Sequence, residues 1–313
     1  TCPRTPNMSR CNISLEIARR SMCPSSRWQD LTSQLLIDAS RADGIVRNLT
    51  MVNVGANKGY NVAEFLQRYN ARGSRVPTNA AWHAELLRGP RRVRYGCGMC
   101  NACRARAPRA RHHVVPLAVH AIEMVQLNVQ ALRRLFAAFE VPGAVHHLAI
   151  SNRSGFARHT TATAVGLEHY ELRDAVGKGG TQRVRVGTVD GFAAQQGIDH
   201  IALLSVDAEG QDALVLEGSQ RLLSSRAVDV LEFEYIGRGF WRRDHADRRL
   251  LSSVLARLGR QGYECFWQAD SGKLARAGGR FWCDQFDFRF RSNLVCSHVP
   301  GILQVFGSLL ADV

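Results

Sequence analysis

Short hydrophobic runs alternate along this chain with longer segments in which hydrophobic positions recur every three or four residues. The first run, Met51–Val54, is followed by a turn with the glycine spacing G-x-x-x-G. After the turn, hydrophobic residues fall at i, i+3, i+4 and i+7, which is the spacing of one face of a helix. This pattern predicts a strand, a turn and a helix with a buried face of Val62, Phe65, Leu66 and Tyr69.

The alternation continues through the rest of the chain. Further strands are predicted at 114–123, 145–150, 201–206, 228–235, 263–268 and 294–298, with helices at 125–139, 188–196 and 247–261 and another after residue 207. Residues 155–186 alternate weakly and are interpreted as a hairpin or a mobile loop. The predicted fold class is α/β: a doubly wound (Rossmann-like), mostly parallel sheet with helices on both faces and antiparallel edge strands at the C-terminal end.

The chain divides into three predicted segments. Residues 1–45 form an N-terminal Cys-bearing arm and then a helix with Trp28, Leu31, Leu35 and Ala39 on one face. Residues 46–300 form the main domain, and residues 301–313 form a C-terminal tail. Within the main domain, residues 71–111 are rich in arginine and cysteine and break the pattern. Because a first β-α-β crossover needs far fewer residues, we interpret this segment as an insertion.

The charge of the chain is strongly positive. Its 313 residues carry a net charge of +14, but only three of the 41 basic residues are lysines, and the arginines are spread along the whole chain. A nucleic-acid-binding domain concentrates its basic residues on one face, so we predict no nucleic-acid partner. No apolar run reaches the length of a transmembrane helix.

The nine cysteines fall into three groups, and four N-x-S/T sequons occur at Asn7, Asn12, Asn48 and Asn152. Together they predict a disulfide-bonded glycoprotein of the secretory pathway lumen (Golgi or ER) or a secreted one, with a cytoplasmic location as the alternative. The chain opens at Thr1 rather than Met, so a membrane association is expected only through a missing N-terminal anchor.

The middle cysteine group, Cys97, Cys100 and Cys103, has a spacing that also suits metal ligands. A closed metal site needs a fourth ligand, and only His112 or His113 is near in sequence. We therefore predict disulfides rather than metal at this group.

Polar residues and glycines follow the ends of five predicted strands. In a doubly wound sheet these carboxyl ends line one crevice, which is where the ligand binds. The residues are Asn53 with Gly55, Ala56, Asn57 and Gly59; Glu123; Ala149 with Ser151; Asp207 with Glu209; and Glu234. The glycine spacing is not the G-x-G-x-x-G of dinucleotide folds, which argues against a dinucleotide oxidoreductase.

The order of the motifs V-G-A-N-x-G, an acid-ended strand at 119–123, L-A-I-S-N-x-S-G and L-L-S-V-D-A-E-G resembles the FkbM family of S-adenosylmethionine-dependent methyltransferases. The resemblance covers about residues 46–300, which makes the main domain a methyltransferase domain. It departs from the family at Asn53, where we expect an acid. The resemblance implies S-adenosylmethionine as cofactor, bound by Asn53, Gly55, Ala56, Asn57, Gly59, Glu123, Ala149 and Ser151.

Each acidic strand end has an expected role. A carboxylate at Glu123 can accept hydrogen bonds from both ribose hydroxyls, or it can simply face the N-terminus of the next helix. Asp207 and Glu209 are the candidate catalytic residues that align the acceptor hydroxyl and remove its proton. Alternatively this pair could hold a divalent metal, which nothing else in the sequence supports. The candidate acceptor-binding residues are Glu234, Arg238, Phe240 and Trp241.

Two functions follow. The first is an O-methyltransferase that transfers a methyl group to a hydroxyl of a carbohydrate or another small polar acceptor. The alternative is a non-catalytic, disulfide-stabilised lumenal or cell-surface binding module that retains the fold. The sequence identifies neither the acceptor nor the oligomeric state.

Overall fold

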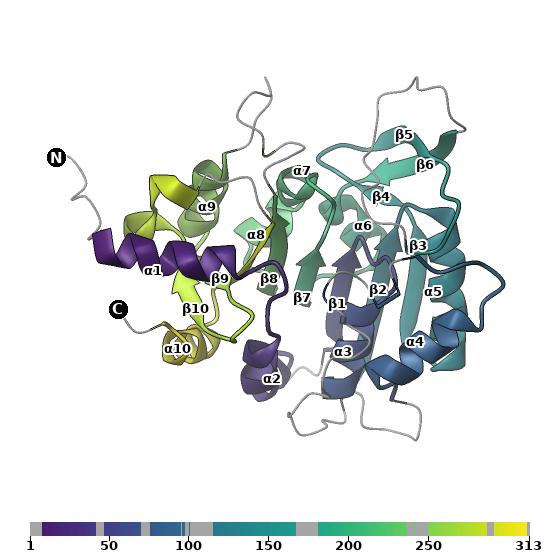
Figure 1. Cartoon of the computed structure of the whole chain (residues 1–313), viewed down its shortest axis with the longest axis horizontal. Helices are drawn as coiled ribbons and strands as arrows, with labels where there is room; N and C mark the ends of the chain where they lie inside the picture. Colours follow the sequence, from purple (N-terminus) through teal and green to yellow (C-terminus); the bar gives the residue numbers. More distant parts are fainter. Residues whose placement is uncertain are drawn as a thin grey trace.

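A large mixed sheet forms the centre of the molecule (Figure 1). The computed structural model describes residues 8–41, 47–69, 76–94, 96–97, 100, 115–166, 181–236, 241, 250–286 and 291–311. Within these residues, the strands of the central sheet are β1 (Leu49–Val54), β2 (Leu117–Glu123), β3 (Gly143–His147), β7 (Ile201–Val206), β8 (Val228–Tyr235), β9 (Glu264–Gln268), β10 (Leu274–Arg276) and β11 (Ser292–Ser297).

The order of these strands is β10-β9-β11-β8-β7-β1-β2-β3. Strands β8, β7, β1, β2 and β3 run parallel, and β11, β9 and β10 add antiparallel pairs at one end. The predicted fold class is therefore confirmed, including the antiparallel strands from the C-terminal part. Strand β7 is buried along its whole length, as its apolar sequence requires.

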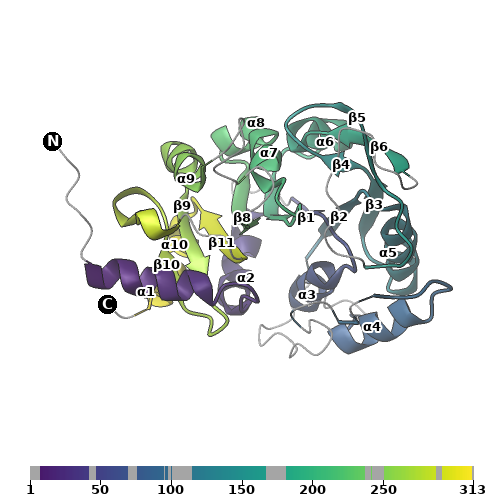
Figure 2. The same ribbon diagram turned by 45° about the horizontal axis from the view of Figure 1, so that its top comes forward.

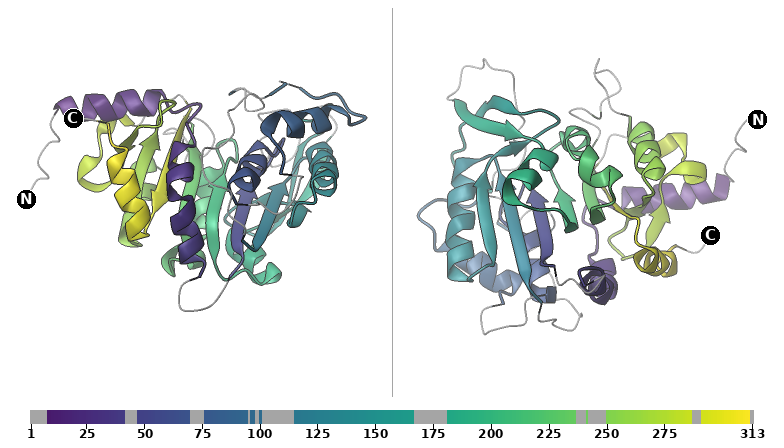
Figure 3. Two further views of the ribbon diagram at one scale, coloured as in Figure 1. Left: turned by 90° about the horizontal axis from the view of Figure 1, so that it is seen from below. Right: turned by 180° about the vertical axis from the view of Figure 1, so that it is seen from behind.

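Helices cover both faces of the sheet (Figure 3). The described helices are α1 (Met8–Arg19), α2 (Arg27–Ala39), α3 (Tyr60–Tyr69), α4 (Asn79–Leu87), α5 (Gln126–Ala138), α6 (Val189–Gln196), α7 (Asp212–Glu217), α8 (Gln220–Ser224), α9 (Leu251–Arg260) and α10 (Pro300–Ser308). Side chains of α2 to α5 and α10 share one hydrophobic core, and those of α1 and α6 to α9 share the other. The β1 side chains alternate between the two cores, with Met51 in the first and Val52 in the second.

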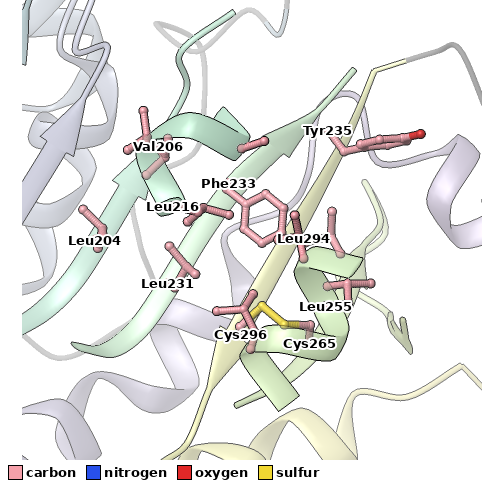
Figure 4. Packing of buried hydrophobic residues seen from close by; sticks show 14 of the residues in the cluster. Leu204, Val206, Leu216, Leu231, Phe233, Tyr235, Leu255, Cys265, Leu294 and Cys296 are labelled. Carbon is pink, nitrogen blue, oxygen red and sulfur yellow. A yellow bond between two sulfur atoms is a disulfide. The ribbon is translucent and has the colours of Figure 1, made fainter. Parts of the chain in front are cut away.

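Part of the second core surrounds a disulfide. Figure 4 shows Leu216, Phe233, Leu255 and Leu294 around the bond between Cys265 of β9 and Cys296 of β11. Two other disulfides join described cysteines, Cys11–Cys283 and Cys23–Cys100. Cys100 of the middle cysteine group is thus oxidised, as predicted, whereas Cys103 lies outside the described residues. These three bonds are consistent with a secreted or lumenal protein.

The predicted strand 145–150 is wrong as a single element. The chain pairs with β2 only to His147, because β2 ends at its partner Glu123. It then enters a separate sheet whose described strands have the order β4-β6-β5, formed by β4 (Ala149–Ile150), β5 (Gly155–Thr160) and β6 (Thr181–Gly187). Strands β5 and β6 pair antiparallel, which confirms the predicted hairpin, and this sheet lies beside β3 and α6 (Figure 2).

Three segments contain helices that the hydrophobic pattern did not predict. The arm contains α1, whose Ile17 and Ala18 are buried in the core. The insertion contains α4, which Thr78 caps by accepting the Ala81 N–H at 3.1 Å. The supposed tail begins as α10, which lies against α2 and buries Ile302 and Phe306 (Figure 1). No helix in the described parts of the chain is both long and apolar enough to cross a membrane.

Smaller differences concern two predicted helices. In α2 the buried face includes Trp28, Leu36 and Ile37, whereas Leu31 is 48% exposed, so the predicted face was partly wrong. The helix predicted after residue 207 is divided into α7 and α8 by the residues at 218–219.

Candidate functional site

The turn between β1 and α3 lies at the carboxyl ends of the central strands. The Gly55 and Ala56 N–H groups donate to the Ile122 carbonyl oxygen at 2.9 and 3.1 Å, which holds the turn against β2. Gly55 has φ +77°, and a Cβ there would lie 1.8 Å from the Asp207 carbonyl oxygen. Only glycine therefore allows the end of β1 to approach the end of β7 so closely.

Glu123, at the end of β2, fastens this turn to the start of α5. One carboxylate oxygen accepts the Asn57 N–H at 2.8 Å, and the other accepts the Val125 N–H at 2.7 Å. The residue is 5% exposed, and burial raises the pKa of its carboxyl although the main-chain donors act against the shift. Both oxygens are thus bonded to the main chain in this structure, and the ribose role of Glu123 stays a prediction.

A tight acidic loop follows β7. The Asp207 N–H continues the sheet by donating to the Val54 carbonyl at 3.0 Å, and Glu209 then adopts a left-handed backbone conformation with φ +52°. Asp212, which is fully buried at the start of α7, accepts the N–H groups of Ala208 and Gly210, both at 3.1 Å. Burial raises the pKa of Asp212 to about 7. Sequence reasoning missed this residue, although an acid at the first position of a helix is a recognisable signal.

Arg291, at the start of β11, joins two of the predicted acids. Its guanidinium lies 3.0 Å from a carboxylate oxygen of Glu209 and 3.1 Å from one of Glu234. Burial, followed by the charges of Asp207 and Asp212, raises the pKa of Glu234 far above that of an ordinary carboxyl, and Arg291 opposes this shift. No sequence signal pointed to Arg291, which is 82 positions from Glu209.

A second polar group lies beneath the start of α2. The Gln268 amide donates to Glu232 at 2.9 Å and accepts the Trp28 indole N–H at 2.8 Å. Burial raises the pKa of Glu232 to about 7. Next to it, the buried Arg68 forms an ion pair of 2.8 Å with Asp30. Glu232 and Glu234 stand two positions apart on β8 and so share one side of the sheet, which the sequence pattern L-E-F-E-Y could have indicated.

Several of these groups line one cavity of about 950 Å³. Its wall includes Gly55, Ala56, Asn57 and Gly59 of the turn, and the acids Asp207, Glu209 and Glu234, so the structure brings together these seven predicted site residues. Four others do not line it: Asn53 is 2% exposed within β1, Glu123 bonds to the far side of the turn, Ala149 lies in β4 of the separate sheet, and Ser151 directly follows β4.

The predicted acceptor-binding residues have different outcomes. Glu234 lines the cavity. Trp241 is 2% exposed and packs against Phe233 and Tyr235 of β8 in the core, because a large aromatic ring gains more from burial than from exposure in a polar cavity. Arg238 and Phe240 lie outside the described residues.

The cavity also has walls that the strand ends did not predict. Residues 22–27 and the disulfide Cys23–Cys100 contribute to one side, and Asp270 and Asn293 contribute from the antiparallel end of the sheet. Among the described residues, no three His, Cys, Asp or Glu side chains are grouped so that they could hold a metal ion.

A doubly wound sheet with a glycine turn after β1 and a polar cavity at the carboxyl ends of its parallel strands defines an α/β protein that binds a small ligand at that edge. A sequence profile of the Methyltransferase FkbM domain matches residues 53–265. The chain belongs to this family of methyltransferases, as its motifs indicated.

A similar solved structure is the methyltransferase FkbM from Methylobacillus flagellatus KT, with 13% sequence identity and a TM-score of 0.40. The match covers 92% of this chain and 59% of that one, so this chain spans less than two thirds of its length. No match was found among curated proteins.

Proposed function

We propose that this methyltransferase uses S-adenosylmethionine, binds it in the cavity, and transfers its methyl group to a hydroxyl of a carbohydrate or another small polar acceptor. The observation that carries the proposal is a local reversal of charge. The chain has a net charge of +14, yet carboxylates outnumber bases among the described residues that line the cavity. The acids are Asp30, Glu64, Asp207, Glu209, Glu232, Glu234 and Asp270, and the bases are Arg27, Lys58, Arg68 and Arg291. Even when the two acids with strongly raised pKa values, Glu232 and Glu234, are left out, five carboxylates face four bases. S-adenosylmethionine carries a sulfonium and an ammonium group, which such a cavity attracts.

The residues present fit the methionine half of this cofactor. The turn at Gly55–Gly59 lines the cavity, and its glycines allow it to pack closely, because a Cβ on Gly55 would collide with the Asp207 main chain and one on Gly59 with Trp82 and Leu132. The Asn57 side-chain oxygen is buried without a hydrogen-bond partner and can accept from a ligand ammonium group. The exposed Asp207 lines the cavity beside the turn and offers a carboxylate to the same ammonium group.

The adenosine half depends on Glu123. Its two oxygens accept the N–H groups of Asn57 and Val125, and the Asn128 side chain and the Met124 main chain also hydrogen-bond to this carboxylate, so a ribose hydroxyl would share or replace one of these contacts. The same contacts hold the turn in shape whether or not ribose is present. Glu123 therefore supports the cofactor site in either role.

When bound, S-adenosylmethionine supplies an electrophilic methyl group on sulfur. The chain has to align the acceptor hydroxyl for in-line attack and take its proton. Glu209 and Glu234 are both held by Arg291, so they are fixed in position and suited to orient acceptor hydroxyls. Of the two candidate catalytic acids that line the cavity, Asp207 serves the ammonium group of the cofactor, and Glu209 is the carboxylate that we assign to accept the proton.

One observation favours the second candidate function, a non-catalytic binding module. Lys58 donates to the Gly166 carbonyl at 3.1 Å, and the Gly166 N–H donates to Asn128 at 2.8 Å. These contacts place residues 165–166 over the region between Glu123 and the turn, where an adenosyl group would need space. A protein with this arrangement can bind a polar ligand in the cavity without binding the cofactor.

Calorimetric titration with S-adenosylmethionine distinguishes the two functions. The Asp207→Asn variant should bind about 10- to 100-fold more weakly than wild type, because a hydrogen bond to a charged group contributes roughly 1.5–3 kcal/mol. The matched control is Asp199→Asn. Asp199 is an exposed acid that lies just before the amino end of β7, at the opposite end of the strand from Asp207, so this variant should bind the cofactor normally. A folded wild type that does not bind the cofactor would support the binding module.

Transfer itself requires a second assay. Wild-type protein with a labelled methyl donor is tested against polyols, monosaccharides and oligosaccharides, and the labelled product is analysed for a methyl ether. Glu209→Gln should lower turnover while cofactor affinity remains within a few-fold of wild type. Label on an amine or a carboxylate instead of a hydroxyl would refute the O-directed reaction.

A further inference from the structure

The hairpin of β5 and β6 presents an unusual outer face. In its antiparallel register Phe156 is opposite Arg185, and Arg158 is opposite Arg183. The exposure pattern alternates along β6, so Val184 and Val186 are buried whereas Arg183 and Arg185 are exposed. Phe156 and Arg158 are exposed on the same face. Three arginines and one aromatic ring therefore share one solvent-facing surface, which we call the arginine face (Phe156, Arg158, Arg183 and Arg185).

The arginines of this face are not neutralised within the described part of the chain. Arg158 donates to the Thr181 hydroxyl at 3.1 Å, and Arg185 donates to the Gln195 side-chain oxygen, also at 3.1 Å. Arg183 lies over the Phe156 ring, with its guanidinium carbon 3.7 Å from the ring centroid. All of these partners are uncharged. Among the described residues, the face thus keeps three positive charges that a ligand can meet.

This arrangement is unfavourable for the hairpin alone. Like charges directly opposite each other on neighbouring strands destabilise a sheet, and Arg158 and Arg183 form such a pair. Phe156 is 63% exposed, more than any other exposed large hydrophobic residue described. Folding gains little from either feature, which points to a binding role.

We propose that the arginine face is a docking surface for an acidic glycan, meaning a polysaccharide segment that carries carboxylate or sulfate groups. Guanidinium groups bind such anions through two parallel hydrogen bonds, and the Phe156 ring offers an apolar face for a sugar ring. Nucleic acid presents similar chemistry. The three disulfides favour the glycan, because they are typical of oxidising compartments in which glycans are the common polyanions.

The position of the hairpin suits a long ligand. Strand β4 follows β3 directly, and β6 pairs with β4, so the small sheet extends from the carboxyl end of β3 (Figures 1 and 2). The cavity lies at the carboxyl ends of β1, β7 and β8. Both features therefore lie toward one edge of the central sheet. The docking surface does not depend on methyl transfer, and its test uses binding alone.

The test compares three proteins for binding to fluorescent oligosaccharides of polygalacturonate and of heparin by anisotropy. The first is wild type, and the second carries Arg158→Gln, Arg183→Gln and Arg185→Gln. The third is a matched control with Arg41→Gln, Arg260→Gln and Arg280→Gln, which removes the same charge from exposed sites elsewhere. The hairpin variant should bind at least one acidic oligosaccharide about tenfold more weakly, and the control within about threefold of wild type. Wild-type binding should also weaken as salt is raised, and that dependence should be smaller in the hairpin variant.

Several measurements keep the outcome clear. Because the hairpin substitutions remove opposed charges, the variant should fold, which thermal unfolding checks. The milder Phe156→Leu variant should weaken binding several-fold without changing the salt dependence, since it keeps all three charges. Equal losses in the hairpin and control variants would overturn the proposal, because binding would then follow net charge alone. Stronger, arginine-face-dependent binding of a single-stranded 15-mer DNA would overturn it in favour of nucleic acid. Titration with S-adenosylmethionine tests the proposed function separately.

Discussion

Replacing Gly55 by alanine should separate the ends of β1 and β7, where the cavity begins. The added Cβ would lie 1.8 Å from the Asp207 carbonyl oxygen and 2.9 Å from its carbon, both of which are main-chain atoms. Main chain cannot move aside as a flexible side chain can. The hydrogen bond from the Asp207 N–H to the Val54 carbonyl, 3.0 Å long, holds the two strands together at this level. Relief of the collision therefore requires this pairing to open.

The expected loss of stability has two parts. A non-glycine residue at positive φ costs about 1–2 kcal/mol, and overpacking in a rigid region costs about 1–3 kcal/mol more. We therefore expect Gly55→Ala to lower the free energy of unfolding by about 2–5 kcal/mol. Gly197→Ala is the matched control, because Gly197 has φ +66° but no heavy atom within 4 Å of its added Cβ. It should lose only the first part, about 1–2 kcal/mol.

Urea unfolding of both variants, with the disulfides kept intact, measures these losses from the transition midpoints. Titration of Gly55→Ala with S-adenosylmethionine, at a urea-free condition where it is folded, should also show weakened binding. The control should bind as wild type does. A Gly55→Ala variant no less stable than Gly197→Ala would show that the ends of the two strands are not packed as described.

Two further predictions concern charge and modification. Burial raises the pKa of Glu232 from 4.5 to about 7, so the folded protein holds this proton while the unfolded chain releases it, and wild type loses stability as pH rises from about 4.5 to about 7. The Glu232→Gln variant lacks this loss. Its free energy of unfolding, compared with that of wild type, should therefore increase by on the order of 3 kcal/mol between pH 4.5 and pH 8, as measured from urea midpoints at each pH. A difference that stays constant with pH would show that Glu232 is not buried in the folded state. For the sequons, glycopeptide mass spectrometry of protein from a secretory host should find glycan at Asn48 or Asn12, both exposed and outside the cavity wall. It should find little glycan at Asn152, which follows the carboxyl end of β4 and whose side-chain amide donates to Glu217 at 3.0 Å. Full occupancy of Asn152 in a protein that binds the cofactor normally would contradict this prediction.

The hydrophobic pattern predicted the central strands well for a physical reason. Strand β7 is buried on both faces, so its sequence is a nearly continuous apolar run. Strand β8 also carries acids, but five of its eight residues are hydrophobic, which was enough to identify it as a strand. Helix α1 was missed because few of its residues are large and apolar, and a disulfide between Cys11 and Cys283 holds it to the core. A cross-link of this kind replaces part of the hydrophobic periodicity from which a helix is predicted.

In the candidate site, too, some residues could be predicted from the local sequence and others could not. The turn at Gly55 and the acids at Asp207 and Glu209 follow strands that can be identified locally, so their position at one edge was predictable. Arg291 and Gln268 were not, because they reach the cavity only through the pairing of β11 with β8 and of β9 with β11. That register depends on contacts between distant segments, which one sequence does not display.

Two walls of the cavity differ in whether the family profile covers them, and this difference indicates which wall selects the acceptor. The family profile covers residues 53–265, which include the glycine turn and the acidic loop. The opposite wall is built from residues 22–31 and from Gln268, Asp270, Arg291 and Asn293, all outside the profile. The disulfide Cys23–Cys100 ties the first of these segments to the insertion. Since a cofactor common to a family is expected to meet its shared elements, the acceptor is expected to meet this second wall. Substitutions at Asp270 or Asn293 should therefore change which acceptors are methylated while leaving the affinity for S-adenosylmethionine nearly constant. A parallel loss of cofactor affinity would place the cofactor, and not the acceptor, against that wall.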